Sequence, residues 1–234
     1  NIWSNIESLT LNLDFDKSPT FLCTSPISYA HGLYNSFLTI LVLGGKILYG
    51  GSLNPISADK ILKSAHKNDA SVFHITPSMI PILNMVGKRT KLPLPNFKYV
   101  ICGTSPLDTQ SKINFESIYK TPIRQQYGMT ESLFMSINID SQESKTKSVG
   151  LALNCKLKIE SDSGQALKNN EIGNIVVKSD SFFGSYYMQP EESKLAYQNG
   201  WFYTGDFGYL DEDGYLIIKG RKKEIIKKGG FNIN

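Results

Sequence analysis

The sequence predicts an α/β protein in which a mostly parallel sheet with flanking helices is followed by a small antiparallel β-barrel subdomain. Up to about residue 147, short apolar runs alternate with segments of helical spacing, a pattern typical of parallel sheets. After Gly150 the chain changes to short strand-like runs separated by turns, with no long helix between them. Its 234 residues are enough for one large or two small domains.

The elements of the first part can be placed in order along the chain. The apolar stretch that begins at Ala30 is expected to be a helix packed on all sides. Ser57 is a candidate N-cap for a helix that continues to His66, and Pro77 fits the first position of another. The expected strands are Thr20–Thr24, Lys46–Tyr49, Ser71–Ile75, Lys98–Gly103 and Thr121–Gln126, with a helix over Leu107–Tyr119.

The second part is expected to be antiparallel, because its strand-like runs are close together and joined by turn residues. The runs are Leu157–Glu160, Gly173–Lys178 and Tyr215–Lys219. Turns are predicted at Ser163-Gly164 and at Asp211–Gly214, and the second of these is interpreted as purely structural.

Composition is that of an ordinary globular protein, with 41% hydrophobic and 20% charged residues. No apolar run is long enough for a membrane span, and no secretory leader is visible. Three widely spaced cysteines fit neither a disulfide framework nor a zinc site, so a cytoplasmic location is expected.

The net charge of +4 comes largely from one basic run, Lys219–Lys228. A nucleic-acid-binding protein would carry a broader basic surface interleaved with stacking aromatic residues. We therefore expect a solvated or hinge-like segment here and no nucleic-acid partner.

Two loops are expected at the carboxyl ends of parallel strands, where such sheets bind ligands. One is Gly103-Thr104-Ser105-Pro106 and the other, within QQYGMTE, is Tyr127-Gly128-Met129-Thr130-Glu131. Glycine allows close approach of a planar ligand, an aromatic ring can stack on a base, and a carboxylate can bind Mg²⁺. The alternative interpretation of QQYGMTE is a strand-to-helix turn with Thr130 as N-cap.

Two later segments carry further candidate groups. In GWFYTGD, residues 200–206, Asp206 is placed to accept hydrogen bonds from ribose hydroxyls, although turn chemistry is the alternative. In GRKKEIIKKGG, residues 220–230, Arg221 has the planar fork that pairs with ribose or phosphate oxygens.

The order and spacing of YGMTE, GWFYTGD and GRKKEIIKKGG strongly resemble the adenylate-forming superfamily of acyl- and aryl-CoA synthetases, luciferases and peptide-synthetase adenylation domains. ICGTSPL, Ser148-Val149-Gly150 and Glu171–Ile175 resemble further motifs of that superfamily, so the resemblance covers essentially the whole chain. It implies that residues 1–147 and 148–220 are two subdomains of a large adenylation domain. Residues 221–234 would then be the hinge and the start of a C-terminal domain.

The resemblance also implies an activity. Members of the superfamily use ATP and Mg²⁺ to convert a small carboxylic acid to an acyl-adenylate, and then transfer the acyl group to a thiol of CoA or of phosphopantetheine on an acyl carrier protein. The implied roles are adenine contacts for Gly103, Thr104, Ser105, Tyr127 and Gly128; catalysis at the α-phosphate for Thr130; Mg²⁺ binding for Glu131; ribose binding for Asp206 and Arg221; the hinge for Lys223; and the pantetheine path for Gly230.

Two parts of the superfamily pattern are not in this sequence: the phosphate loop and the catalytic lysine of the small C-terminal domain. We therefore expect the chain to be a fragment and, alone, a poor adenylating catalyst. A non-catalytic nucleotide-binding remnant of the same fold is the alternative.

The substrate pocket is expected around Pro26–Gly32, where many acyl-CoA synthetases have a Pro-Leu-Phe-His-x-x-Gly motif. Here Tyr29 stands at the histidine position and His31 follows two residues later, and a purely structural His31 is the alternative. Residues 18–58 contain no Asp or Glu that could pair with an α-ammonium group. An uncharged acyl or aryl tail is therefore expected.

Overall fold

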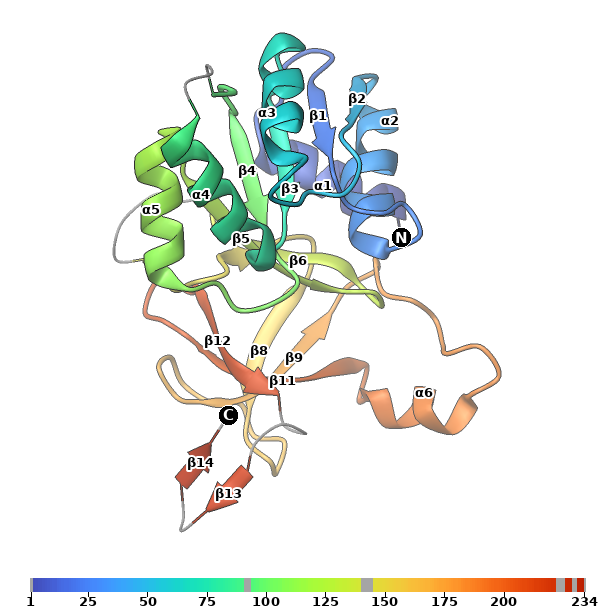
Figure 1. Ribbon diagram of the computed structural model, residues 1–234. Helices are drawn as coiled ribbons and strands as arrows, with labels where there is room; N and C mark the ends of the chain where they lie inside the picture. Colours follow the sequence, from blue (N-terminus) through green and yellow to red (C-terminus); the bar gives the residue numbers. More distant parts are fainter. Residues whose placement is uncertain (1, 91–93, 140–144, 222–225, 229–230, 234) are drawn as a thin grey trace.

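Two β-sheets organise the molecule in this computed structural model, which describes residues 2–90, 94–139, 145–221, 226–228 and 231–233 (Figure 1). A larger, mostly parallel sheet with helices on both faces forms one end, and an antiparallel sheet forms the other. Within the described residues, no helix is both long and apolar enough to span a bilayer.

The larger sheet has seven strands in the order β2-β1-β3-β4-β5-β6-β7. The strands from β2 to β5 pair in parallel, whereas β5-β6 and β6-β7 are antiparallel, so the expected mostly parallel sheet is confirmed. The bounds are Thr20–Cys23 for β1, Lys46–Tyr49 for β2, Val72–Ile75 for β3, Tyr99–Cys102 for β4, Ile123–Met129 for β5, Leu133–Ile137 for β6 and Leu151–Ala152 for β7.

Helices cover both faces of this sheet, so its central strands β3 and β4 are buried at every position. Side chains of α3, α4 and α5 share one core with β1, β3 and β4, and those of α1 and α2 share a second core on the opposite face. The helical elements are α1 Ile2–Asn12, η1 His31–Leu38, α2 Thr39–Leu43, α3 Ala58–Lys67, η2 Pro77–Met79, α4 Ile80–Arg89, α5 Thr109–Tyr119 and α6 Pro190–Ala196.

Two expectations about helices need correction. The apolar segment after Ala30 is helical, first as the π-helix η1 and then as α2, but it is not packed on all sides, because Leu41 and Val42 are 59% and 39% exposed beside the edge strand β2. Ser57 does precede α3, but it does not cap it. Its backbone is already helical, and its hydroxyl donates instead to the carbonyl of Ser52.

The second sheet is antiparallel, as expected, with the order β10-β11-β9-β8 and β12 paired to β11. The turn at Asp211–Gly214 joins β11 to β12, and the described residues at the C-terminal end add the hairpin β13–β14. The bounds are Lys156–Glu160 for β8, Gly173–Lys178 for β9, Tyr197–Gln198 for β10, Trp201–Leu210 for β11, Leu216–Arg221 for β12, Ile226–Lys228 for β13 and Phe231–Ile233 for β14.

The segment QQYGMTE forms the end of β5 and the start of the turn that leads to β6. Tyr127 and Gly128 belong to β5, and β6 begins at Leu133, directly after a tight turn. The interpretation of Thr130 as the N-cap of a helix is therefore wrong, because the residues that follow pair back onto β5 as a hairpin. The subdomain boundary near residue 147 stays a prediction; β7, at Leu151–Ala152, still belongs to the larger sheet.

Candidate functional site

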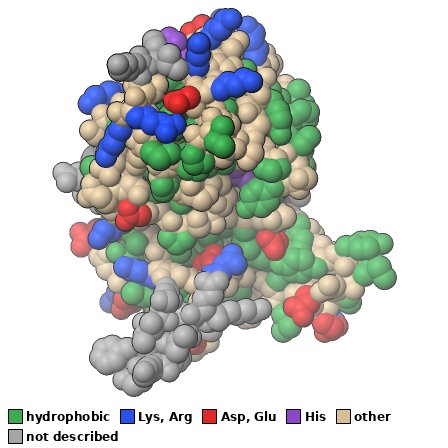
Figure 2. All heavy atoms as spheres, viewed as in Figure 1, with side chains coloured by type: hydrophobic (Ala, Val, Ile, Leu, Met, Phe, Trp, Pro, Cys, Tyr) green, Lys and Arg blue, Asp and Glu red, His purple; other side chains and the backbone are tan. Residues whose placement is uncertain are grey.

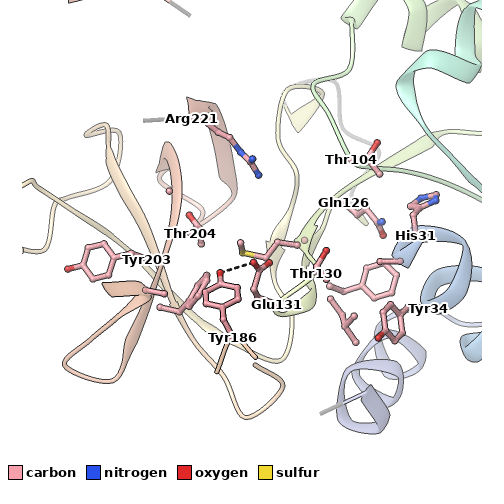
Figure 3. Close-up of a pocket in the computed structure, with 18 of the residues that line it drawn as sticks. His31, Tyr34, Thr104, Gln126, Thr130, Glu131, Tyr186, Tyr203, Thr204 and Arg221 are labelled. Carbon is pink, nitrogen blue, oxygen red and sulfur yellow. Dashed lines mark hydrogen bonds between the residues drawn. The ribbon is translucent and has the colours of Figure 1, made fainter. Parts of the chain in front are cut away.

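A cavity of about 790 Å³ lies where the two sheets meet (Figure 3). Its wall combines residues of the η1 region, the β5–β6 hairpin, the α6 segment and strands β11 and β12. The lining includes these residues expected from the sequence to act at the site: Tyr29, His31, Thr104, Gly128, Thr130, Glu131 and Arg221. Segments up to about 190 residues apart in the sequence thus contribute to one concave surface, the usual setting of a small-molecule site.

The β5–β6 hairpin carries Thr130 and Glu131 into this cavity. The strand register shifts between Tyr127 and Gly128, and such bulges re-aim the side chains that follow. Gly128 is required there, because a Cβ atom would lie 2.0 Å from the carbonyl oxygen of Leu133. The close approach of the two strands therefore depends on a residue without a side chain.

The α1 helix supports this hairpin from behind. The buried Asn5 side chain donates from Nδ2 to the carbonyl oxygen of Phe134 at 2.8 Å and accepts from the Phe134 amide at 3.2 Å. These contacts fix the start of β6, and so the position of the turn between Thr130 and Ser132.

The Glu131 carboxylate is held by a residue from outside the hairpin. Tyr186 Oη donates to Glu131 Oε1 at 2.8 Å, as the dashed line in Figure 3 shows. The backbone amide of Phe183 donates to the Glu131 carbonyl at 2.9 Å. Burial first, and then the bond to Glu131, raise the pKa of Tyr186 to about 12, so its hydroxyl stays protonated as a donor near neutral pH.

Strand β11 forms the opposite wall. Its pairing with β9 shifts register between Tyr203 and Phe207, at the Thr204-Gly205-Asp206 sequence of GWFYTGD. Gly205 has φ +78°, a left-handed conformation that favours glycine. Asp206 is 5% exposed and accepts from Arg221 Nε at 2.9 Å, so the two residues expected to bind a ribose lie together.

Tyr127 also bonds to Asp206, with its Oη 2.5 Å from Asp206 Oδ2. Its ring is 8% exposed and packs in the core of the antiparallel sheet with Met135 and Ile175, outside the set of cavity-lining residues. Burial and the negative charge of Asp206 raise the pKa of Tyr127 well above its ordinary value. In this structure Tyr127 therefore connects the β5 strand to the β11 strand, and its stacking on adenine stays a prediction.

The other residues predicted to act at the site do not all line the cavity. Thr104 lines the cavity, whereas Gly103 is buried beneath the side chain of Gln126 and Ser105 is exposed away from the lining. Lys223 and Gly230 lie outside the described residues, so their expected roles in the hinge and the pantetheine path stay predictions.

At the η1 end of the cavity, Tyr29 and His31 both line the wall, with ring centroids 6.3 Å apart. The Nδ1 atom of His31 lies 3.3 Å from Ser25 Oγ, while its Nε2 has no hydrogen-bond partner among the described residues. His74 packs against it and is fully buried, and neither of its ring nitrogens bonds to any residue that the structure describes. Burial lowers the pKa of His31 to about 4 and that of His74 well below its ordinary value, so this end of the cavity is uncharged at neutral pH.

These histidines predict a pH dependence of stability. In the unfolded chain both histidines become protonated below about pH 6.5. In the folded chain their pKa values are lower, about 4 for His31, so both side chains stay neutral in that range. The free energy of unfolding therefore falls as the pH decreases from 6.5 towards 4. Each histidine contributes a slope of about 1.4 kcal/mol per pH unit at most. Urea unfolding at several pH values should show a shallower slope for His74→Leu than for the wild type, and parallel curves above pH 7.

Glu131 could hold a divalent cation. Its Oε1 accepts from Tyr186, and no residue in the described part of the chain donates to Oε2. Within the same described ranges, no cluster of three or more His, Cys, Asp or Glu side chains forms a protein-only metal cage. A single carboxylate ligand beside the Thr130 hydroxyl suits Mg²⁺, which keeps water ligands and takes others from substrate phosphates.

The sequence interpretation missed part of the lining. Tyr186 and Leu195 come from the segment before and within α6, and Tyr203 and Thr204 come from β11. Phe182, Phe183, Tyr186 and Tyr187 make this region unusually aromatic for a segment without regular structure, and that density was a usable signal.

The chain is similar to known enzymes in both sequence and structure. The profile of the AMP-binding enzyme family matches residues 1–187. The chain is 31% identical over 224 residues to 4-coumarate–CoA ligase-like 4 of Oryza sativa subsp. japonica, covering 93% of this chain and 40% of the relative. It is 26% identical to oxalate–CoA ligase of Arabidopsis thaliana, covering 100% of this chain and 46% of the relative.

Solved structures agree. ATP-bound MatB from Rhodopseudomonas palustris superposes with a TM-score of 0.90 at 28% identity, covering 99% of this chain and 46% of that one. O-succinylbenzoate coenzyme A synthetase from Bacillus subtilis in complex with AMP gives a TM-score of 0.86 at 25% identity, with 99% and 47% coverage. The chain thus spans about half the length of the relatives it matches.

Proposed function

This chain belongs to the AMP-binding enzyme family, and on that premise we propose that it is the ATP-binding part of a longer AMP-forming acid–thiol ligase. One observation supports the proposal: Thr130 and Glu131 line the same cavity as Arg221. The Nε atom of Arg221 donates to the buried Asp206, which is not itself a lining residue. The turn after β5 would contact the phosphates and the β11–β12 pair would contact the ribose, so strands of two different sheets would bind one nucleotide.

Residues of this chain would bind different parts of the ATP molecule. Asp206, fixed by Tyr127 and Arg221, would accept hydrogen bonds from the ribose hydroxyls through its remaining lone pairs. The Thr130 hydroxyl would donate to an α-phosphate oxygen. Thr104 would lie beside the adenine. Because these groups are positioned by strands, the nucleotide would be oriented before the reaction begins.

Glu131 would hold Mg²⁺, which when bound neutralises charge that develops on the phosphate oxygens during attack by the carboxylate. Thr130 and Glu131 would therefore stabilise the same developing charge from neighbouring positions on the turn. The product of this step is an acyl-adenylate, with pyrophosphate as the leaving group.

The acid would enter at the Tyr29 and His31 end. The cavity-lining residues of the η1 region, Tyr29, Ala30, His31, Tyr34 and Asn35, carry no acidic side chain, and His31 is neutral. An ammonium group there would be left unpaired, so we propose an acid with an uncharged acyl or aryl tail. The CoA-ligase names of the relatives support CoA as the thiol acceptor, with carrier-protein phosphopantetheine as the alternative.

The test is carboxylate-dependent ATP–pyrophosphate exchange by the complete protein that contains this chain, with a panel of fatty, aryl and amino acids. We expect exchange with at least one fatty or aryl acid and none with amino acids. ATP binding without exchange for any acid would instead identify a non-catalytic nucleotide-binding protein, and exchange with amino acids alone would overturn the proposed substrate class.

The 234-residue chain on its own provides a second arm of the same experiment. We expect it to catalyse exchange poorly, because neither a phosphate loop nor a C-terminal lysine is among its residues. Exchange at the rate of the complete protein would contradict that expectation.

A further inference from the structure

Tyr186 lies outside the β5–β6 hairpin and hydrogen-bonds to the Glu131 side chain. Its Oη donates to Glu131 Oε1 at 2.8 Å, and both residues line the cavity. In Figure 3 the phenol lies between Glu131 and the β11 wall, with its hydroxyl directed at the carboxylate. A hydrogen bond to one oxygen of a carboxylate fixes the direction of the second oxygen, Oε2, which none of the described residues bonds.

The position of Tyr186 is fixed by two contacts of its own and by one contact of Phe183, on which its ring packs. Its backbone amide donates to Ser193 Oγ of α6 at 2.8 Å. Its ring packs on Phe183 with centroids 4.5 Å apart. The carbonyl of Phe183 in turn accepts from Tyr197 Oη at 2.7 Å. The phenol is therefore anchored through both its backbone and its ring before it reaches Glu131.

The same segment also holds the backbone of Glu131. The amide of Phe183 donates to the Glu131 carbonyl at 2.9 Å, so residues three apart in one segment contact both the main chain and the side chain of a single residue. Phe183 is fixed by contacts with Phe202 and Tyr197, at centroid distances of 5.9 and 6.1 Å. A side chain needed only for packing would not require its hydroxyl to be aimed in this way.

The residues that follow Tyr186 in the sequence are exposed to solvent, unlike Tyr186 itself. Tyr187 is 89% exposed and Met188 is 82% exposed, and Figure 2 shows hydrophobic side chains on the projecting α6 segment. Tyr186, the immediate neighbour of Tyr187, turns inward to the cavity instead.

From this geometry we infer that Tyr186 is a positioning residue: it orients the Glu131 carboxylate so that Oε2 is presented to the Mg²⁺ of a bound Mg–ATP complex. The inference rests on the proposed function, because it assigns Glu131 its role in metal binding. It adds a specific dependence of metal affinity on a hydroxyl group 55 residues away in the sequence.

The experiment compares wild type, Tyr186→Phe and Tyr187→Phe in the complete protein. ATP binding is measured by calorimetry across a Mg²⁺ titration and again in EDTA. For Tyr186→Phe we expect the Mg²⁺ concentration that gives half-maximal enhancement of ATP affinity to rise about tenfold, the effect of losing one hydrogen bond to a charged group. Metal-free ATP affinity should be unchanged. Tyr187→Phe, the same chemical change on an exposed neighbour, should match the wild type.

Any other result for Tyr186→Phe would contradict the inference that Tyr186 orients Glu131. An unchanged Mg²⁺ requirement in Tyr186→Phe would overturn this inference while leaving the proposed function intact. A lower requirement would also overturn it, since the hydroxyl would then compete with the metal. Equal loss of ATP affinity with Mg²⁺ and in EDTA would indicate a merely structural role. Absence of ATP binding by the wild type would overturn the proposed function and this inference together.

A double-mutant cycle gives an independent readout. In a Glu131→Gln background, Tyr186→Phe should not change the Mg²⁺ requirement further, because the two residues act through one contact. Additive effects of the two substitutions would show that Tyr186 acts elsewhere and would overturn the inference.

Discussion

Glu131→Gln is expected to lower carboxylate-dependent ATP–pyrophosphate exchange by about 10²–10³-fold, the range seen when one group that stabilises transition-state charge is removed. Glutamine keeps the size of the side chain and can still accept from Tyr186, so the hairpin should stay folded. What it loses is the negative charge that a hard cation requires. The measurement is the exchange rate at saturating acid and ATP, with Mg²⁺ varied over a wide range.

Glu192→Gln is the matched control. Glu192 is a second carboxylate in the lining of the same cavity, located on α6 rather than on the hairpin. It should leave the exchange rate within about twofold of wild type, as for a solvated side chain. If the two variants lose activity equally, general loss of negative charge in the cavity, rather than metal binding at Glu131, is the cause.

Gly128→Ala is expected to destabilise the fold, lowering the free energy of unfolding by about 3 kcal/mol. The added methyl group would lie 2.0 Å from the Leu133 carbonyl oxygen, and a backbone atom cannot move aside as a side chain end can. For a chain of this size that corresponds to a fall of roughly 6–12 °C in Tm. Thermal unfolding followed by circular dichroism would measure it.

Gly184→Ala is the control for this change. Gly184 has no atom within 4 Å of the position that a Cβ would take, and its φ is outside the left-handed region. Its effect should stay within about 0.5 kcal/mol. A Gly128→Ala protein as stable as Gly184→Ala would mean that β5 and β6 can separate without cost, contrary to the tight pairing described above.

The regular part of the fold was predictable because its signals are local. The parallel strands and helices α3 and α5 follow from apolar periodicity within 10 or so residues, and most of their bounds agree with prediction to within two residues. The strand Trp201–Leu210 was not predicted, since Gly205 and Gly208 interrupt its pattern. Those glycines occur at or beside register shifts, which break strand periodicity.

The candidate site was predictable only in part. Thr130, Glu131 and Arg221 were selected because their types and spacing indicate nucleotide chemistry, and they do line one cavity, while their roles stay predictions. Tyr186 could not be assigned to Glu131 in this way, because 55 residues separate them and no periodicity connects them. Nor could spacing indicate that Tyr127 would be buried against Asp206, a contact that depends on how the two sheets meet.

The two hydrogen bonds between the Asn5 side chain and the Phe134 backbone have a consequence for folding kinetics. They join residues 129 positions apart, so the loop that must close before the contact forms includes most of the larger sheet. Because the entropy of loop closure is lost before a distant contact can compensate for it, we expect this contact to form late. The turn that carries Thr130 and Glu131 would then be among the last parts of the molecule to reach its final geometry during refolding.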